Sequence, residues 1–210
     1  MKVELHLHTS RYSPCARHRP EELLSRLVAT GYDAVYLTEH DAVWDDGELA
    51  ALQEQFPEIR IFPGIERSIG PILDGQHLII LGARDPEYAR LCEPSELLAR
   101  ARMHGHLAIL AHPLRSPSSA AMLLAGLRPD ALECRTGSHD EARANMIARA
   151  AVRLRLPLVN AGDVHRLVHV NKCWIETLPD LHHADDIRDV ILSGHYTLHT
   201  RDLVPAVYVE

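Results

Sequence analysis

The chain has 210 residues, of which 46% are hydrophobic, so it can bury one substantial core and is expected to form a single domain. Its net charge of −7 comes from 29 acidic and 22 basic residues, with no run of Lys or Arg that would bind a long nucleic acid. No stretch approaches the roughly 20 apolar residues of a membrane span, and four widely spaced cysteines argue against a disulfide framework. We therefore expect a cytoplasmic protein with reduced thiols and no membrane partner.

Short apolar runs alternate with helical patterns along the chain. The expected strands are 3–8, 34–40, 59–66, 77–82, 107–112, 131–134 and 157–163. The expected helices are 20–30, 46–56, 94–104, 118–127 and 140–154. This alternation implies parallel strands with right-handed crossovers, in an open sheet or in a barrel. After residue 165 it ends, and segments 171–176, 184–193 and 196–199 are expected to cover one end or edge of the structure.

Histidines and carboxylates stand at the ends of nearly all of these strands. An open sheet gathers its functional groups at one switch point, whereas a (β/α) barrel collects them at the carboxyl ends of all its strands. The pattern therefore favours a barrel. The strand-end groups are His6-Leu7-His8, Glu39-His40-Asp41, Glu66, His77, His112, Glu133 and Asp163-Val164-His165.

The spacing of these residues suits metal binding. His6 and His8 lie two residues apart in a strand, so both side chains share one face and can bind the same ion. Asp163 and His165 repeat this spacing. Imidazoles mixed with carboxylates suit Zn, Mn or Fe, and suit Mg less well. Two ions about 3.5–4 Å apart, bridged by a carboxylate, lower the pKa of a shared water, which is the chemistry of hydrolysis.

Six motifs, in order, resemble those of the polymerase and histidinol phosphatase (PHP) superfamily of metal-dependent phosphoesterases, over residues 3 to 175. They are His6-Leu7-His8-Thr9, Thr38-Glu39-His40-Asp41, Pro63-Gly64-Ile65-Glu66, His77 before Leu-Ile-Ile-Leu-Gly, Ala111-His112-Pro113 and Gly162-Asp163-Val164-His165. The resemblance implies one α/β domain over residues 1–210, a distorted (β/α)7 TIM-like barrel with a covering segment at about 176–210. It also implies one ion on His6, His8, Glu66 and Asp163, a second on Glu66, His77 and His112, and a third on His40 and His165.

The sequence departs from the family pattern in two places. Where many members complete the third metal site, residues 12–18 read Tyr-Ser-Pro-Cys-Ala-Arg-His, so Cys15 or His18 would have to supply the ligand. Glu39 stands before His40 where Asp is usual. The resemblance therefore implies two or three divalent ions, and the third site is the least complete.

The expected reaction is hydrolysis of a phosphate ester, in a small phosphorylated metabolite or nucleotide, by a hydroxide that bridges the ions. Arg115 and Arg135 are expected to bind the phosphate, with Arg115 ranked first. His165 or Asp41 would protonate the leaving oxygen, and Glu133 would orient a ligand histidine.

Two other functions stay open. An amidohydrolase-like enzyme would use the same chemistry on a C–N or ester bond, and a non-catalytic regulatory domain would bind metal without turnover. Arg11 and Arg166 are further candidates for phosphate binding, and His104 and His106 are expected at the opposite end of the barrel from the metal ions. The sequence does not indicate the oligomeric state.

Overall fold

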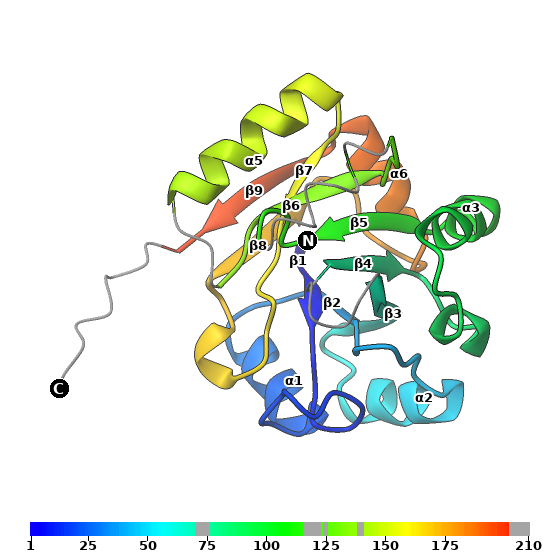
Figure 1. Cartoon of the computed structure of the whole chain (residues 1–210). Coiled ribbons are helices and arrows are strands. Elements are labelled where there is room, and N and C mark those ends of the chain that lie inside the picture. The colour runs from blue at the N-terminus through cyan, green and yellow to red at the C-terminus, as the bar shows by residue number, and fades with distance from the viewer. Residues whose placement is uncertain (70–75, 116–122, 124–125, 138–140, 202–210) are drawn as a thin grey trace, which may run out of the picture.

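The computed structural model describes residues 1–69, 76–115, 123, 126–137 and 141–201. Within them, one sheet with strand order β7-β6-β5-β4-β3-β2-β1-β8-β9 curls into a nearly closed barrel surrounded by helices (Figure 1). The strands are β1 (Lys2–Leu7), β2 (Ala34–Leu37), β3 (Arg60–Ile69), β4 (Gln76–Leu81), β5 (Leu107–Ala111), β6 (Ala131–Arg135), β7 (Leu158–Asn160), β8 (Cys173–Thr177) and β9 (Tyr196–Thr200). The helices are α1 (Pro20–Ala29), α2 (Asp46–Gln55), α3 (Pro94–His104), α5 (Glu141–Leu154) and α6 (Asp186–Ser193).

The expected barrel is confirmed, with one correction to its topology. The seven expected strands correspond to β1 to β7, and α1, α2, α3 and α5 lie where helices were expected; the helix expected over 118–127 falls almost wholly outside the described residues. The strands are not all parallel, because β4 runs antiparallel to both β3 and β5. Only residues 70–75 separate β3 from β4, which is too short a connection for a crossover helix.

The chain after residue 165 belongs largely to the sheet. β8 pairs antiparallel with β1, and β9 pairs antiparallel with β8. Only α6 covers an end of the barrel: Ile187 and Ile191 pack into the inner core, and Asp185 contacts His106 just before β5. The parallel strands begin at this end, so α6 lies opposite their carboxyl ends.

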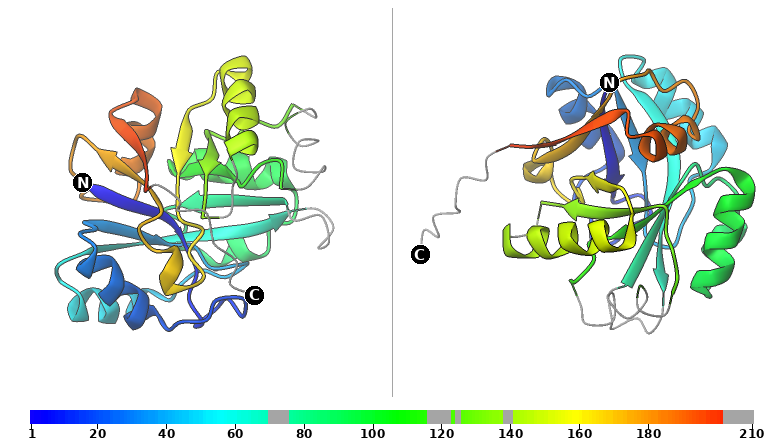
Figure 2. Two further views of the ribbon diagram at one scale, coloured as in Figure 1. Left: turned by 90° about the vertical axis from the view of Figure 1, so that its left-hand side faces the viewer. Right: turned by 90° about the horizontal axis from the view of Figure 1, so that it is seen from above.

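Helices flank the sheet on more than one side (Figure 2), and three clusters of buried apolar side chains hold the barrel together. One fills the interior, one lies under α1 and α2, and one lies under α3 and α5. β1 changes register with β2 between Glu4 and Leu7, so Leu5 packs in the inner core whereas Leu7 packs under α1.

No helix among the described residues is long and apolar enough to span a membrane. The four cysteines form no disulfide; Cys134 and Cys173 are buried, whereas Cys15 and Cys92 are exposed.

Candidate metal centre

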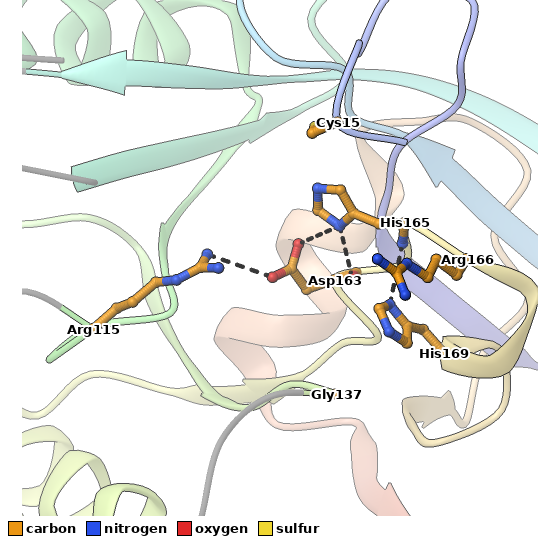
Figure 3. A pocket seen from close by; sticks show the side chains of 7 residues that line it. All are labelled: Cys15, Arg115, Gly137, Asp163, His165, Arg166 and His169. Carbon is orange, nitrogen blue, oxygen red and sulfur yellow. Dashed lines mark hydrogen bonds and ion pairs between the residues drawn. The ribbon is translucent and has the colours of Figure 1, made fainter. Parts of the chain in front are cut away.

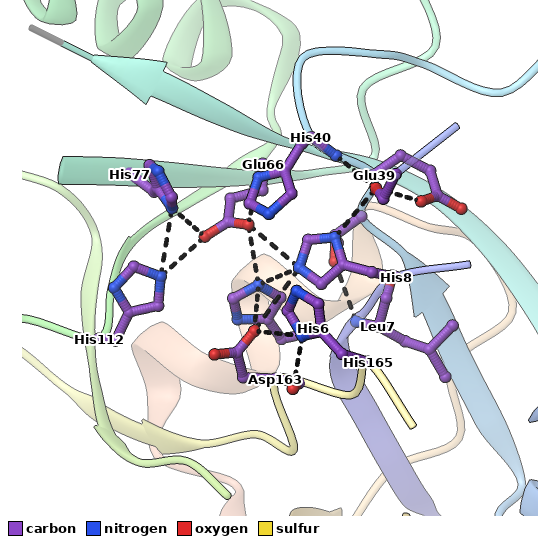
Figure 4. Close-up of polar contacts among 12 residues, drawn as sticks. His6, Leu7, His8, Glu39, His40, Glu66, His77, His112, Asp163 and His165 are labelled. Carbon is purple, nitrogen blue, oxygen red and sulfur yellow. Dashed lines mark hydrogen bonds and ion pairs between the residues drawn. The ribbon is translucent and has the colours of Figure 1, made fainter. Parts of the chain in front are cut away.

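Histidines and carboxylates from six parts of the sheet meet at one rim of the barrel, where the parallel strands end (Figure 4). They are His6 and His8 (β1 and its end), His40 (after β2), Glu66 (β3), His77 (β4), His112 (after β5), and Asp163 and His165 (after β7). His77 reaches this rim because β4 is antiparallel, which puts its first residues beside the last residues of β5. Hydrogen bonds from His8 N to Val164 O and from Val164 N to His6 O, 2.9 and 3.0 Å, close the barrel here.

Glu66 lies at the centre of this group and is fully buried. Its Oε1 lies 2.8 Å from His77 Nδ1 and 2.9 Å from His112 Nε2. Its Oε2 lies 3.2, 3.1 and 3.0 Å from ring nitrogens of His6, His8 and His40. Because each oxygen faces a different set of imidazoles, this carboxylate is placed to bridge two ions.

Asp163 adds a second carboxylate on the side of His6 and His8. Its Oδ1 lies 3.5 and 3.6 Å from their Nε2 atoms and 3.4 Å from His165 Nδ1. Three groups of side chains in the described residues are close enough to hold an ion: His6, His8 and Asp163; His40, Glu66 and His77; and His8, His40 and His165. These groups contain seven of the eight expected metal ligands, and the eighth, His112, lies against Glu66 at the same rim.

The hydrogen bonds of the ligand histidines fit bound metal. His6 Nδ1 lies 2.9 Å from Glu133 Oε1, and His8 Nδ1 lies 3.3 Å from Ser13 Oγ. With Nδ1 as the donor in both rings, the two Nε2 atoms face each other at 2.9 Å. Such a contact needs a cation between the two nitrogens, either a shared proton in the metal-free protein or a metal ion that both rings bind. Glu66 Oε2, which is buried and accepts no hydrogen bond, fits the same conclusion.

Burial and the mutual approach of these groups shift their pKa values. Burial lowers the pKa of His40 to about 4 and also lowers that of His165, so both rings stay neutral and able to bind a metal. Burial also disfavours the charged form of His6, but the nearby Glu66, Glu133 and Asp163 raise its pKa well above the usual range. Burial raises the pKa of Glu66, yet the imidazoles around it have the larger effect and hold that pKa well below its ordinary value.

Three residues of the rim have backbone conformations that side chains rarely adopt. The φ angles of Asp41, His112 and Asp163 are 54°, 28° and 47°. Left-handed conformations of this kind cost free energy in residues other than glycine, and they concentrate at functional sites.

Glu133 and Ser13 hold the ligands in place. Glu133 accepts from His6 Nδ1 through Oε1 and from His112 N through Oε2, at 2.9 and 2.6 Å, so it contacts two of the expected metal ligands. Ser13 was not identified from the sequence. Its Oγ donates to Glu39 Oε2 at 2.5 Å and accepts from His40 N at 3.0 Å, beside His8 Nδ1.

Glu39, which stands where Asp is usual in the resembled motif, connects the loop after β1 to β2 through this contact with Ser13. Its buried carboxylate also accepts from Thr9 N and Oγ1 and from Trp44 Nε1. The longer side chain fastens the loop after β1 to the end of β2. This contact could not be read from spacing, because it depends on how the loop folds back.

Glu4 lies beside the centre without facing it. Its Oε1 accepts from Gly162 N and His6 N at 2.7 and 3.1 Å, while its buried Oε2 has no partner. Burial raises the pKa of this carboxyl from 4.5 to about 8. Glu4 is therefore protonated in the folded protein at neutral pH and ionised in the unfolded chain.

Replacing Glu4 with glutamine is expected to stabilise the chelator-treated protein at alkaline pH. The raised pKa stabilises the folded wild type fully below pH 4.5, and this contribution is lost as the pH rises towards about 8. Glutamine stays neutral, so the stability advantage of the variant should grow by about 3 kcal/mol between pH 6 and pH 9. Urea unfolding at several pH values measures this difference; a gap that stays constant or shrinks contradicts the assignment.

A pocket of about 420 Å³ opens next to the metal ligands (Figure 3). Asp163 and His165 form part of its wall, together with Cys15, Arg115, Arg166 and His169. Arg115 Nη1 lies 3.7 Å from Asp163 Oδ2, so this guanidinium lies beside one of the expected metal ligands. Arg115 was expected to bind the phosphate of a substrate there. The short helical turn Leu167–His169 brings His169 into the pocket wall, and no periodic pattern in the sequence marks that turn.

Other expected site residues have different partners in the structure. Arg135 forms an ion pair with Glu141 of α5. The carboxylate of Asp41 is held by Arg67 and by Ser68 N and Oγ.

Two further candidates can be placed in the same way. Arg11 pairs with Glu48. His18 Nδ1 lies 3.9 Å from Glu22 Oε1 on α1, which leaves Cys15 as the residue of this loop that reaches the pocket.

Comparison with solved structures identifies the fold. No protein-family model matches the sequence, and the comparison with curated proteins finds no match. The chain is similar to a two-domain protein from Bacteroides vulgatus that contains a predicted PHP-like metal-dependent phosphoesterase, with TM-score 0.73 and 16% identity over 97% of this chain. It spans 65% of the length of that protein. The fold is PHP-like.

Two further structures share this PHP-like fold to a lesser degree. One, from Bifidobacterium adolescentis, is named as a candidate metal-dependent phosphoesterase and matches with TM-score 0.63 and 14% identity, over 90% of this chain and 94% of its own. The other is an amidohydrolase from Chromobacterium violaceum with bound sulfate and no metal, with TM-score 0.58 and 18% identity over 79% of this chain and 88% of its own. Identities this low show the fold alone, so the chemistry of this chain has to be argued from its own residues.

Proposed function

We propose that this protein is a metal-dependent hydrolase of phosphate esters that acts on a small phosphorylated metabolite or nucleotide. The observation that carries the proposal is Glu66, a buried carboxylate with imidazoles on both oxygens, beside a pocket that contains Arg115. Two divalent ions held by Glu66 and the surrounding imidazoles and Asp163 would supply Lewis acidity and a water of lowered pKa. Zn, Mn and Fe suit this donor set better than Mg.

The residues of the chain divide the remaining work. Arg115, with about half of its side chain exposed at the rim, can turn its guanidinium towards two phosphate oxygens. Arg166 and His169 line the same pocket and add donors for an anionic group. His165, whose Nδ1 lies 3.0 Å from Asp163 O, is our candidate for moving a proton when no third ion is bound. Burial lowers its pKa and keeps the ring neutral, so it would first accept the proton of the attacking water and then pass it to the leaving oxygen.

Changing Arg115 to alanine is expected to raise KM for a phosphate monoester about 10- to 100-fold, because a charge-assisted bidentate contact is lost. The value of kcat should change less. Arg135→Ala is the matched control: it removes an arginine that pairs with Glu141, and its KM should stay at the wild-type value. Steady-state kinetics with Mn²⁺ test both variants, and an unchanged KM in Arg115→Ala refutes this role.

The similarity to an amidohydrolase gives a reason to test one alternative function, hydrolysis of a C–N or ester bond. An arginine at the rim suits a phosphate, whose oxygens accept its paired hydrogen bonds, and a carbonyl substrate has no need of one. Purified protein should be analysed for metals and then assayed on a phosphate monoester, a phosphodiester and a simple amide. Turnover of the amide alone would favour the rival, and bound metal without any turnover would favour a regulatory domain.

A further inference from the structure

A second group of histidines lies at the opposite end of the barrel, where the parallel strands begin. His104 ends α3 and His106 precedes β5, and Gly105 between them adopts φ 78°. Across a pocket of about 570 Å³, His182 and His183 stand in the loop before α6. The proposed hydrolysis uses none of these side chains.

Two of these imidazoles are already held through one nitrogen. His104 Nδ1 lies 3.0 Å from the hydroxyl of the buried Tyr88, and His106 Nδ1 lies 2.6 Å from Asp185 Oδ1. With Nδ1 as donor in both rings, each Nε2 keeps a lone pair for a ligand. His6 and His8 are held in this way at the metal centre, and metal-binding histidines generally have such a partner on the second nitrogen.

Gly82 allows one wall of this pocket to form. Its φ is 97°, and a Cβ there would lie 2.3 Å from Asp185 Oδ1 and 2.6 Å from His106 Nδ1. The carboxylate and imidazole therefore pack directly on the glycine backbone at the end of β4.

The facing loop has a fixed backbone and exposed side chains. Asp186 Oδ2 accepts from His182 N and His183 N at 2.7 and 2.8 Å, and Tyr36 donates its hydroxyl to Ala184 O at 2.6 Å. Both imidazoles are exposed, so their rings can rotate towards the pocket at little cost.

The charges around the pocket are compatible with a cation. Asp85 and Asp185 line it, and Arg84, the positively charged residue of the lining, has its Nη1 3.5 Å from Asp46 Oδ1. A donor set dominated by imidazole selects borderline transition metals over Mg²⁺ or Ca²⁺.

We propose that this pocket is a separate binding site for a divalent transition metal of the zinc class. The ligands are Nε2 of His104 and His106, completed by the ring of His182 or His183 once it rotates inwards. The ion would join the corner between α3 and β5 to the loop before α6, far from the rim that holds Glu66.

The double variant His104→Asn/His106→Asn tests the site. Asparagine places an amide nitrogen near the position of Nδ1, so the contacts with Tyr88 and Asp185 can persist while both Nε2 atoms are lost. Chelator-treated, tag-free proteins are titrated with Zn²⁺ by calorimetry, and bound zinc is counted by elemental analysis. Wild type should bind one Zn²⁺ per chain more than the variant, and the variant should still fill the sites around Glu66.

Two further variants test whether the extra zinc ion binds in this pocket or at any exposed histidine of the chain. His195→Asn/His199→Asn removes two histidines elsewhere on the chain and should leave the zinc count unchanged. His182→Ala/His183→Ala changes only exposed side chains, so it should fold normally while weakening the extra site at least about tenfold. Equal zinc binding in wild type and His104→Asn/His106→Asn, or an equal loss in the His195/His199 control, overturns the proposal.

Discussion

Replacing Glu66 with glutamine is expected to remove both bound metal and turnover. Glutamine keeps the shape of the side chain but loses its charge and one acceptor oxygen. In the wild type, ring nitrogens of His6, His8 and His40 lie 3.0–3.2 Å from Glu66 Oε2. In the variant, an ion bound by these imidazoles would have no negatively charged oxygen at this position. We expect metal affinity to fall at least about 100-fold and kcat/KM about 1,000-fold.

Elemental analysis after dialysis measures the first effect, and phosphate monoester hydrolysis measures the second. Glu54→Gln is the matched control, since this exposed carboxylate on α2 should affect neither quantity. A Glu66→Gln protein that kept its full metal content would show that Glu66 does not bridge ions. Loss of metal with retained turnover would refute metal-dependent hydrolysis.

Acidification is expected to release the ions and stop turnover together. Because Glu66, Glu133 and Asp163 raise the pKa of His6, this ring holds a proton at neutral pH in the metal-free protein, and metal binding must displace it. Affinity should therefore fall as the pH falls, about tenfold per unit for each proton displaced. His40, with a pKa of about 4, stays neutral through this range and contributes little to the loss.

Calorimetry in two buffers with different ionisation enthalpies counts the protons released at pH 7, and at least one is expected for the first ion. Dialysis at a series of pH values should show metal content and activity declining together below about pH 6. Affinity that stays constant between pH 5 and pH 8 would contradict a site built largely on histidine.

The barrel could be predicted because two features of the sequence indicated it: the alternation of strands with helices, and the histidines and carboxylates at the strand ends. Strand lengths and helix bounds follow from local signals such as Pro20 at the start of α1 and Gly105 after α3, both of which lie at element boundaries in the structure. The direction of β4 could not be predicted in this way. An apolar run has no intrinsic direction, and only the short connection over residues 70–75 pointed to a hairpin.

The gathering of the expected metal ligands at one rim could likewise be predicted, and so could the contact of Glu133 with a histidine, whereas the roles of Ser13 and Glu39 could not. His6 and His8 are marked by spacing, since residues two apart share a face of a strand. Ser13 and Glu39 act through a loop that folds back over the barrel rim, and such contacts have no period. Arg135 was expected to bind phosphate, but although it is the last residue of β6, it forms an ion pair with Glu141 at the start of α5.

The closing of the barrel between β1 and the segment after β7 has a consequence for folding. His6 and Asp163 stand on opposite sides of this seam, and the bond from Val164 N to His6 O joins residues that are far apart in the sequence. A nascent chain that ends before residue 163 therefore lacks one of the four residues expected to hold the first ion. Bringing such distant residues together costs chain entropy, so we expect this ion to bind after the barrel has closed and to stabilise the closed form.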